Sequence, residues 1–314
     1  MRSIKSWKYF FKLIRYPNLL YILFTQYLLR YALMSPVFQH EGLHFSLPDL
    51  HFALLVFSTL CIAAAGYIIN DYFDLNIDQI NKPEKVIIDK HIPRRWAIAW
   101  HSILNLTGII IALYLSWYLH SWWMWLCQAV CTLLLWFYST HFKRLPLIGN
   151  VIISGLTSFT LIVLIIYEPQ FYNSTHAQMI WPLNRLIWLY AVCAFLLSMV
   201  REIVKDLEDL FGDSKEGCHT APIVWGIQAS KWMATGILIA FELLMIYCIS
   251  QAFHLEWILA GLYLIVFVWF PVLLIMFYLI RAIAVRNYHI VSQLIKGVML
   301  TGIISMAVLY LYLM

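Results

Sequence analysis

Nine long apolar stretches dominate the chain, and short polar segments separate them. Each stretch is close to or above the roughly 20 residues that a helix needs to cross a bilayer. They run at about 18–37, 50–70, 96–118, 122–140, 147–167, 184–204, 230–250, 255–280 and 290–313. This pattern predicts an all-α integral membrane protein, built as a bundle of nine transmembrane helices.

The composition supports this prediction. Hydrophobic residues make up 63% of the 314 positions, charged residues make up 12%, and the mean hydropathy is +0.78. These values exclude an ordinary soluble domain. No segment resembles a nucleic-acid-binding module. The six cysteines contain no CxxC pair, and we interpret them as small core residues rather than as metal ligands or disulfides.

The positions of Lys and Arg predict the orientation in the membrane. If the N-terminus is cytoplasmic, all of the 21 Lys and Arg residues except Arg30, Arg185 and Lys296 lie in the N-terminal segment or beside loops that follow even-numbered spans. We therefore expect a multi-pass protein of a bacterial or archaeal cell membrane, with its N-terminus and two large loops, at about 71–95 and 205–229, in the cytoplasm. We expect no cleavable signal peptide, because the basic start runs directly into a full-length span.

The first 16 residues have the pattern of an amphipathic helix. Apolar side chains on one face alternate with basic side chains on the other: Ile4, Trp7, Phe11 and Ile14 against Lys5, Lys8, Lys12 and Arg15. This predicts an interfacial helix on the inner leaflet, and purely topogenic charge is the alternative. The expected domains are therefore this segment at 1–16 and a single nine-helix domain at 17–314.

An acidic pattern occurs twice, each time at the cytoplasmic end of an apolar span. The two copies are Asp71-x2-Asp74-x3-Asp78 and Asp206-x2-Asp209-x3-Asp213. This spacing places three carboxylates on one helical face, where they repel one another and also meet the negative end of the helix dipole. Such an arrangement predicts that bound cations neutralise the carboxylates.

Carboxylates without a nearby His or Cys ligand suit Mg²⁺, which binds through a few carboxylates together with phosphate oxygens. We therefore expect two Mg²⁺ ions and a diphosphate ligand. Because six Asp residues and a diphosphate exceed the charge of two Mg²⁺, basic side chains should converge on the same cavity. The candidates are Lys85, Arg94, Arg95, Lys143, Arg144, Arg201 and Lys205; a topogenic or snorkelling role is the alternative for each of them.

A diphosphate at the mouth of an aromatic-rich helical bundle implies that the rest of the substrate is a long apolar tail. If the tail is allylic, loss of diphosphate leaves a carbocation, which aromatic rings stabilise and which water would quench. The sequence therefore predicts a central cavity that opens to the cytoplasmic side and binds a prenyl diphosphate.

These residues resemble the UbiA-type membrane prenyltransferases. The resemblance covers roughly residues 10–314 and rests on both acidic motifs, with Asn70 before the first, on Asn81-Lys82-Pro83, and on the element at 138–144 that contains Tyr138 and Lys143. It implies that Asn70, Asp71, Asp74, Asp78, Asp206, Asp209 and Asp213 hold Mg²⁺ and diphosphate. It also implies that Lys143 contacts the diphosphate, and that Arg15 and Asn18 line the substrate cavity.

Within that family, the segment around the second motif most resembles the geranylgeranylglyceryl-phosphate prenyltransferases. The resemblance implies geranylgeranyl diphosphate as donor and an ether-lipid phosphate as acceptor, with an aromatic quinone precursor as the alternative. The loop after the first motif departs from the family pattern, because Lys85 replaces an Arg and a Pro and a Gly are missing. Basic residues suited to an acceptor phosphate are Lys8, Lys12, Arg15 and Arg94.

Two rival functions come from other residues. His40-Glu41-x2-His44 matches the helical zinc-peptidase motif, although it follows Pro36 and contains Gly42. Ionisable residues within spans, namely Arg30, Glu242 and Lys296, would suit a transporter. Glu242 and Lys296 are candidates for a pair between two spans. The carboxylates nevertheless gather at one membrane face, and this favours the prenyltransferase.

Overall fold

The structure is a computed structural model that describes residues 2–84, 86–172 and 174–314. These residues form helices joined by short loops. In chain order the elements are α1 Arg2–Leu13, α2 Tyr16–Leu28, η1 Leu29–Met34, α3 Ser35–His40, α4 Asp49–Phe73, α5 Leu75–Asn81, α6 Arg94–Tyr118, α7 Trp125–Thr140, η2 Phe142–Arg144, α8 Ile148–Ile166, η3 Pro169–Phe171, α9 Ser174–Met179, α10 Trp181–Lys215, α11 Ala221–Val224, α12 Ile227–His254, α13 Ile258–Leu264, η4 Ile265–Trp269, α14 Phe270–Arg281 and α15 Val285–Leu313.

The predicted all-α membrane class is confirmed. Within the described ranges, seven segments are long and apolar enough to cross a membrane: α4, α6, α8, α10, α12, the continuous α13–η4–α14 segment, and α15. The other two predicted spans also form helices. The stretch at 18–37 lies in the continuous α2–η1–α3 segment, and the stretch at 122–140 contains α7, which has 16 residues.

Two of the long segments contain a short π-helical stretch, and each stretch precedes a proline. η1 is followed by Pro36 in α3, and η4 is followed by Pro271 in α14. Proline lacks an N–H, and its ring clashes with the carbonyl four residues earlier, so the helix widens locally to continue. Both segments therefore remain helical across a residue that normally ends a helix.

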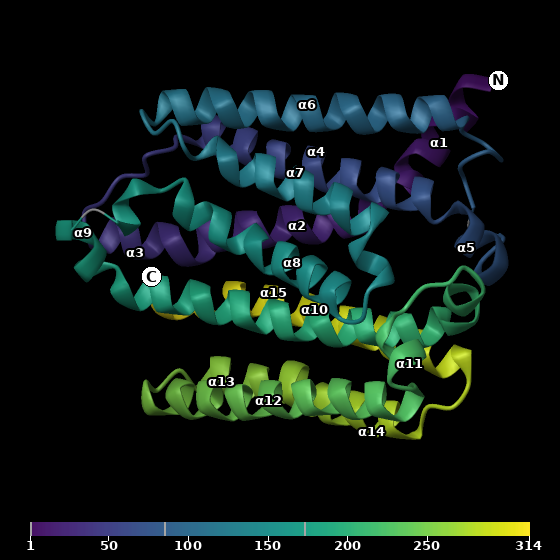
Figure 1. Ribbon diagram of the computed structural model, residues 1–314. Helices are drawn as coiled ribbons and strands as arrows, with labels where there is room; N and C mark the ends of the chain where they lie inside the picture. Colours follow the sequence, from purple (N-terminus) through teal and green to yellow (C-terminus); the bar gives the residue numbers. More distant parts are fainter. Residues whose placement is uncertain (1, 85, 173) are drawn as a thin grey trace.

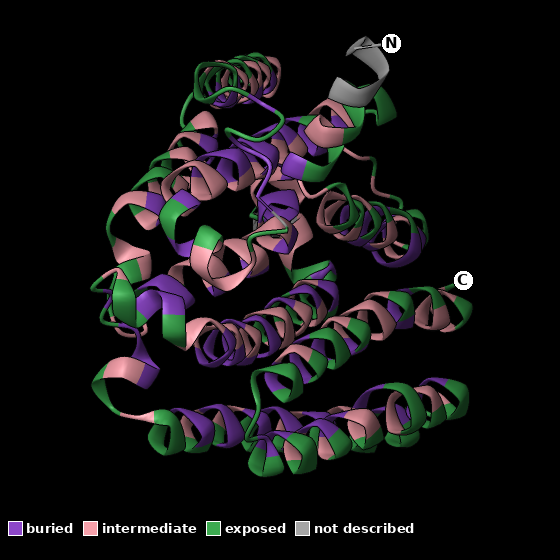
Figure 2. Cartoon of the chain, turned by 90° about the vertical axis from the view of Figure 1, so that its right-hand side faces the viewer, coloured by how far each residue is buried: buried purple, intermediate pink, exposed green. Residues whose placement is uncertain are grey.

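The long helices run roughly parallel to one another and form two groups, one on each side of α10 and α15 (Figure 1). α12, α13 and α14 form a layer next to α10 and α15, while α4, α6 and α7 lie on the other side. Figure 2 shows that exposed residues line the outer sides of the peripheral helices, whereas buried residues lie between neighbours. Many exposed side chains are large and apolar, such as Trp117 on α6 and Leu243 on α12. This distribution is expected where lipid, not water, surrounds the helices.

Helix α10 is the longest element and carries the second acidic motif. Its 35 residues extend about 52 Å at 1.5 Å per residue, which exceeds the roughly 30 Å hydrocarbon core of a bilayer. The helix therefore continues beyond its apolar part, and 205–215, predicted as part of a loop, is helical. The apolar residues Val204 and Leu207 are buried and keep this part of α10 packed on the bundle.

The first acidic motif is divided between two helices. α4 ends at Phe73 and α5 starts at Leu75, while Asp74 lies at the junction with φ −87° and ψ 3°. The prediction that Asp71, Asp74 and Asp78 share one continuous helix is therefore wrong. α5 packs against α10. Its Leu75 and Ile77 are buried, Leu75 in a cluster with Leu13, Ile68 and Val86.

The N-terminal segment is helical, as predicted, and its end packs on the bundle. α1 ends at Leu13, and Leu13 and Ile14 are buried against residues of α4 and of 86–97. Trp7 and Phe11 are exposed. Arg15 takes a left-handed conformation, with φ 50°, and this turns the chain sharply into α2.

A close contact joins α5 to α10. The side chain of Asn81 donates from Nδ2 to the carbonyl oxygen of Asp209 (3.0 Å), and its Oδ1 accepts from the backbone N–H of Gly212 (2.9 Å). A Cβ atom on residue 212 would stand only 2.4 to 2.6 Å from the Asn81 side chain. Only glycine at this position allows the two helices to approach so closely.

We expect Gly212→Ala to lower the unfolding temperature of the detergent-solubilised protein. The new methyl group displaces Asn81 and breaks two hydrogen bonds, at a cost of about 1–3 kcal/mol, which exceeds the gain of roughly 0.5–1 kcal/mol in helix propensity. Gly236→Ala is the matched control, because a Cβ at Gly236 on α12 meets nothing within 4 Å. Equal unfolding temperatures for the two variants would show that the Asn81 contact contributes nothing.

Candidate functional site

The first acidic motif is contacted by two basic side chains from other parts of the chain and by an amide side chain from α4 itself. Arg15 Nη2 lies 2.6 Å from Asp71 Oδ1. Lys143, which follows α7, forms a salt bridge with Asp74 Oδ1, and Asn70 Nδ2 donates to Asp74 Oδ2 at 2.8 Å. The structure therefore brings Lys143, which was expected to contact the diphosphate, and Arg15, which was expected to line the substrate cavity, to the first motif.

The second motif has its own partners. Asn150, at the start of α8, donates from Nδ2 to Asp206 Oδ2 at 2.8 Å. Lys82, just after α5, lies with its Nζ 2.7 Å from Asp209 Oδ1 and 3.0 Å from Glu208 Oε1. Because Lys82 follows the first motif in sequence and contacts the second, the two motifs face each other at one end of the bundle.

The pKa of Asp78 also indicates that the two acidic motifs lie close together. Burial, followed by the charges of Asp74 and Asp71, raises the pKa of the Asp78 carboxyl to about 7. The charge of Asp209, from the other motif, acts in the same direction. Protonation relieves this repulsion in the absence of a ligand, and a divalent cation would relieve it more strongly.

The donor atoms at this end of the bundle fit a hard cation. Among the described residues, no three His, Cys, Asp or Glu side chains converge closely enough to hold a metal ion alone. The available ligands are carboxylate oxygens together with Asn70 Oδ1, which is buried and has no hydrogen-bond partner. Mg²⁺ uses such oxygens, and it completes its coordination with water and substrate phosphates.

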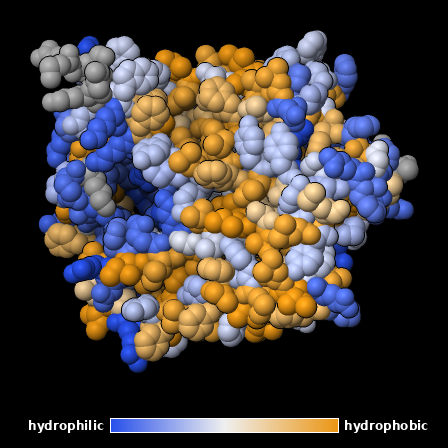
Figure 3. All heavy atoms as spheres, turned by 180° about the vertical axis from the view of Figure 1, so that it is seen from behind, coloured by the Kyte–Doolittle hydropathy of each residue, from blue (hydrophilic) through white to orange (hydrophobic). Residues whose placement is uncertain are grey.

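Next to the acidic motifs, a cavity of about 970 Å³ extends along the bundle. Its lining is mostly apolar and includes side chains of α2, α4, α7, α8, α10, α12 and α15. Figure 3, which shows the molecule from behind, has a hollow lined by hydrophilic residues at the end where α5 and α11 lie. The polar end and the apolar length of the cavity suit an amphipathic substrate.

Most of the predicted site residues lie at this end. The cavity lining contains Arg15, Asn18, Asn70, Tyr138, Arg201 and Lys205. Lys143 and five of the six Asp residues form the adjoining layer described above. For the sixth, Asp213, burial and then the charges of Asp209 and Asp74 raise the pKa of the carboxyl to about 7. Arg144 is exposed, and its carbonyl oxygen accepts a hydrogen bond from His219 N at 2.8 Å. Lys85 lies outside the described residues.

Three basic residues proposed for an acceptor phosphate do not reach the cavity. Lys8 and Lys12 are exposed on α1, and Arg94 pairs with Asp89 at 2.7 Å on the surface. The fourth, Arg15, does line the cavity, but it pairs with Asp71. Lys82, Asn150 and Glu202 also contact this site, although no sequence pattern predicted a functional role for them, and Lys296 was expected only on a transport path. For Lys82, the position directly after the first motif was the available signal.

The rival functions receive no support from the geometry. α3 ends at His40, and Gly42 has φ +67°, so the two histidines of the zinc motif do not share a helical face. Lys296 does not pair with Glu242, because its Nζ donates to Asn18 Oδ1 at 2.6 Å. Both carboxylate oxygens of Glu242 are buried without a hydrogen-bond partner.

The relatives that the chain resembles in sequence share one name. Digeranylgeranylglyceryl phosphate synthase of Thermococcus kodakarensis is 34% identical over 189 residues, which cover 60% of this chain and 61% of that protein. The protein of the same name from Methanosphaera stadtmanae is 30% identical over 262 residues, 81% of this chain and 86% of the relative. The chain spans about three fifths of the length of the Thermococcus relatives it matches.

Solved structures share the fold. A structure of a digeranylgeranylglyceryl phosphate synthase superposes with a TM-score of 0.61 and 23% identity, over 96% of this chain and 99% of that chain. A UbiA homologue from Archaeoglobus fulgidus, bound to DMAPP and Mg²⁺, superposes with a TM-score of 0.56 and 15% identity, over 94% and 98% of the two chains. The sequence model of the UbiA prenyltransferase family matches residues 29–312. The chain therefore belongs to the UbiA prenyltransferase family.

Proposed function

We propose that this protein catalyses the Mg²⁺-dependent transfer of a geranylgeranyl group from its diphosphate to geranylgeranylglyceryl phosphate. The observation that carries the proposal is the pair of acidic motifs facing each other, with Arg15, Lys143 and Lys82 between them, beside a long apolar cavity. The names of the relatives support the ether-lipid acceptor. The homologue bound to DMAPP or GPP with Mg²⁺ supports the donor class and the metal.

We further propose nine membrane crossings with the acidic end in the cytoplasm. The α2–η1–α3 segment and α7 supply the two crossings beyond the seven long apolar segments. The excess of Lys and Arg at one side supports this orientation. In this arrangement, the diphosphate of the donor lies beside the acidic motifs at the membrane surface, and its apolar tail lies within the membrane.

Asn70, Asp71, Asp74 and Asp78 would hold one metal ion, and Asp206, Asp209 and Asp213 the other. Bound Mg²⁺ would neutralise the diphosphate and stabilise the charge that develops on it as it leaves. Lys143 and Arg15 lie on the carboxylates of the first motif, so their N–H groups are placed to donate to phosphate oxygens as well. Together these groups would fix the diphosphate at the mouth of the cavity.

Once the diphosphate is bound, the remaining steps require that the acceptor hydroxyl lies close to the donor carbon and that the cavity excludes water. The C–O bond to the diphosphate breaks, its electron pair stays on the diphosphate oxygen, and an allylic cation remains. The acceptor hydroxyl oxygen attacks this carbon and loses its proton to a carboxylate or to the released diphosphate. The apolar lining excludes water, and Tyr138 supplies an aromatic ring beside the polar end.

The direct test incubates purified protein with geranylgeranyl diphosphate, Mg²⁺ and a panel of acceptors, and identifies the products by mass. The panel contains geranylgeranylglyceryl phosphate, 4-hydroxybenzoate, homogentisate and dihydroxynaphthoate. We expect transfer to the glyceryl phosphate. Transfer to an aromatic ring alone would replace the ether-lipid assignment with a role in quinone synthesis.

We expect Asp74→Asn and Asp209→Asn each to lower the turnover number by about a hundredfold or more, because each removes a negative charge that would hold the metal ion and, through it, the diphosphate. Asp89→Asn is the matched control, since Asp89 pairs with Arg94 on the surface. Initial rates at saturating Mg²⁺ measure the effect. Normal rates in both site variants would eliminate the proposed metal roles.

The affinity for Mg²⁺ should depend on pH near neutrality. The Asp78 carboxyl, with its pKa raised to about 7, must lose its proton to bind a metal, so the affinity rises between pH 6 and pH 8. The expected slope is about tenfold per pH unit below the pKa. Calorimetric titration of Mg²⁺ at several pH values measures it, and Asp78→Asn should reduce both the affinity and the slope. A flat profile in the unsubstituted protein would contradict this role for Asp78.

A further inference from the structure

A second group of cations lines the cavity on the membrane side of the acidic motifs. Arg201 and Lys205 extend from α10, and Lys296 extends from α15. Glu202 binds both α10 cations: its Oε1 lies 3.2 Å from Arg201 Nη1 and 2.6 Å from Lys205 Nζ. The side chains of Arg201 and Glu202 are 20% and 10% exposed, so this group is largely shielded from solvent.

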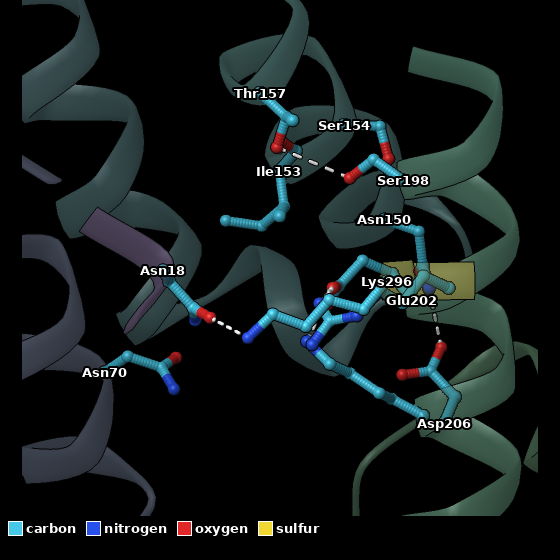
Figure 4. Close-up of polar contacts among 12 residues, drawn as sticks. Asn18, Asn70, Asn150, Ile153, Ser154, Thr157, Ser198, Glu202, Asp206 and Lys296 are labelled. Carbon is cyan, nitrogen blue, oxygen red and sulfur yellow. Dashed lines mark hydrogen bonds and ion pairs between the residues drawn. The ribbon is translucent and has the colours of Figure 1, made fainter. Parts of the chain in front are cut away.

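Within this group, Lys205 directly precedes Asp206, whereas Arg201, Glu202 and Lys296 lie deeper in the membrane than the acidic motifs. Glu202 precedes Asp206 by one helical turn on α10, a displacement of about 6 Å toward the middle of the membrane. Lys296 is well inside α15, and its Nζ donates to Asn18 Oδ1 at 2.6 Å and lies 4.9 Å from the centre of the Tyr21 ring. Figure 4 shows Lys296 and Asn18 pointing toward each other, with Asp206 turned to Asn150.

The charges of this group do not balance. Arg201 and Lys205 share one carboxylate, Glu202, while Lys296 contacts Asn18 instead, and the nearby Arg15 is already paired with Asp71. Among the described side chains, Lys296 forms no ion pair, and Arg201 Nε is buried without a hydrogen-bond partner. Unbalanced charge in a cavity within the membrane is costly. A phosphate monoester, which carries about −1.5 to −2 charges at pH 7, would neutralise it.

We propose that Lys296 and Arg201 bind the phosphate monoester of the acceptor lipid, with Asn18 orienting Lys296. This inference rests on the function proposed above and assigns separate cations to the two anionic groups. Lys143 and Lys82, beside the acidic motifs, serve the donor diphosphate. Only a few covalent bonds separate the phosphate of a glyceryl phosphate from its free hydroxyl, so anchoring the phosphate here brings the hydroxyl to the donor carbon beside the diphosphate.

The test compares Lys296→Met with Lys296→Arg in steady-state kinetics. We expect Lys296→Met to raise the KM for geranylgeranylglyceryl phosphate by about tenfold to a hundredfold, as expected for loss of a charged contact, and to leave the KM for the donor unchanged. Lys296→Arg should recover most of the loss. Lys12→Met is the matched control, because Lys12 is exposed outside the cavity.

A second measurement uses geranylgeranylglycerol, which lacks the phosphate. The unsubstituted protein should prefer the phosphorylated acceptor, and Lys296→Met should lose most of this preference. A rise in the donor KM instead, or equal losses with both acceptors, would overturn the assignment. If Lys296→Met does not fold, Arg201→Gln provides the same comparison, with the unfolding temperature measured for each variant. Failure of the unsubstituted protein to use any glyceryl phosphate would instead refute the proposed function itself.

Discussion

The repulsion among six carboxylates gathered at one end of an apolar bundle is the constraint on which the rest of the structure depends. Cations from elements distant in sequence reduce this repulsion by pairing with the carboxylates: Arg15 before α2, Lys82 after α5 and Lys143 after α7. Asn81 and Gly212 add a contact without charge that holds the two acidic helices together. The same repulsion that would destabilise this end without counter-charges gives it affinity for divalent cations.

The cavity beside the carboxylates would position the two lipid substrates relative to each other. On our account, its two cation layers lie at different depths, one beside the carboxylates and one about a helical turn further into the membrane. A donor held by its diphosphate and an acceptor held by its phosphate would then meet with their reactive atoms between the layers. The mostly apolar walls would hold the lipid tails and exclude water. Position in the membrane, more than any single side chain, would determine which groups react.

The sequence predicted the elements better than it predicted their contacts. Each of the nine apolar runs coincides with a helical segment, because bilayer length and hydrophobicity constrain a span strongly. The sequence also predicted that one end of the bundle contains both acidic motifs together with Arg15 and Lys143. The break at Asp74 was missed, because the spacing of charges alone does not show where a helix ends. The partner of Lys296 was missed for another reason, since pairing between helices depends on how they rotate and pack.

The most direct test of the account is a structure of the protein with Mn²⁺ in place of Mg²⁺ and a non-reactive thio analogue of geranylgeranyl diphosphate, with the metal located by its anomalous scattering. We expect two metal ions between the acidic motifs, one on the carboxylates of each motif, and both in contact with the diphosphate oxygens. Metal bound away from Asp74 and Asp209, or a diphosphate outside the space between α5 and α10, would contradict it.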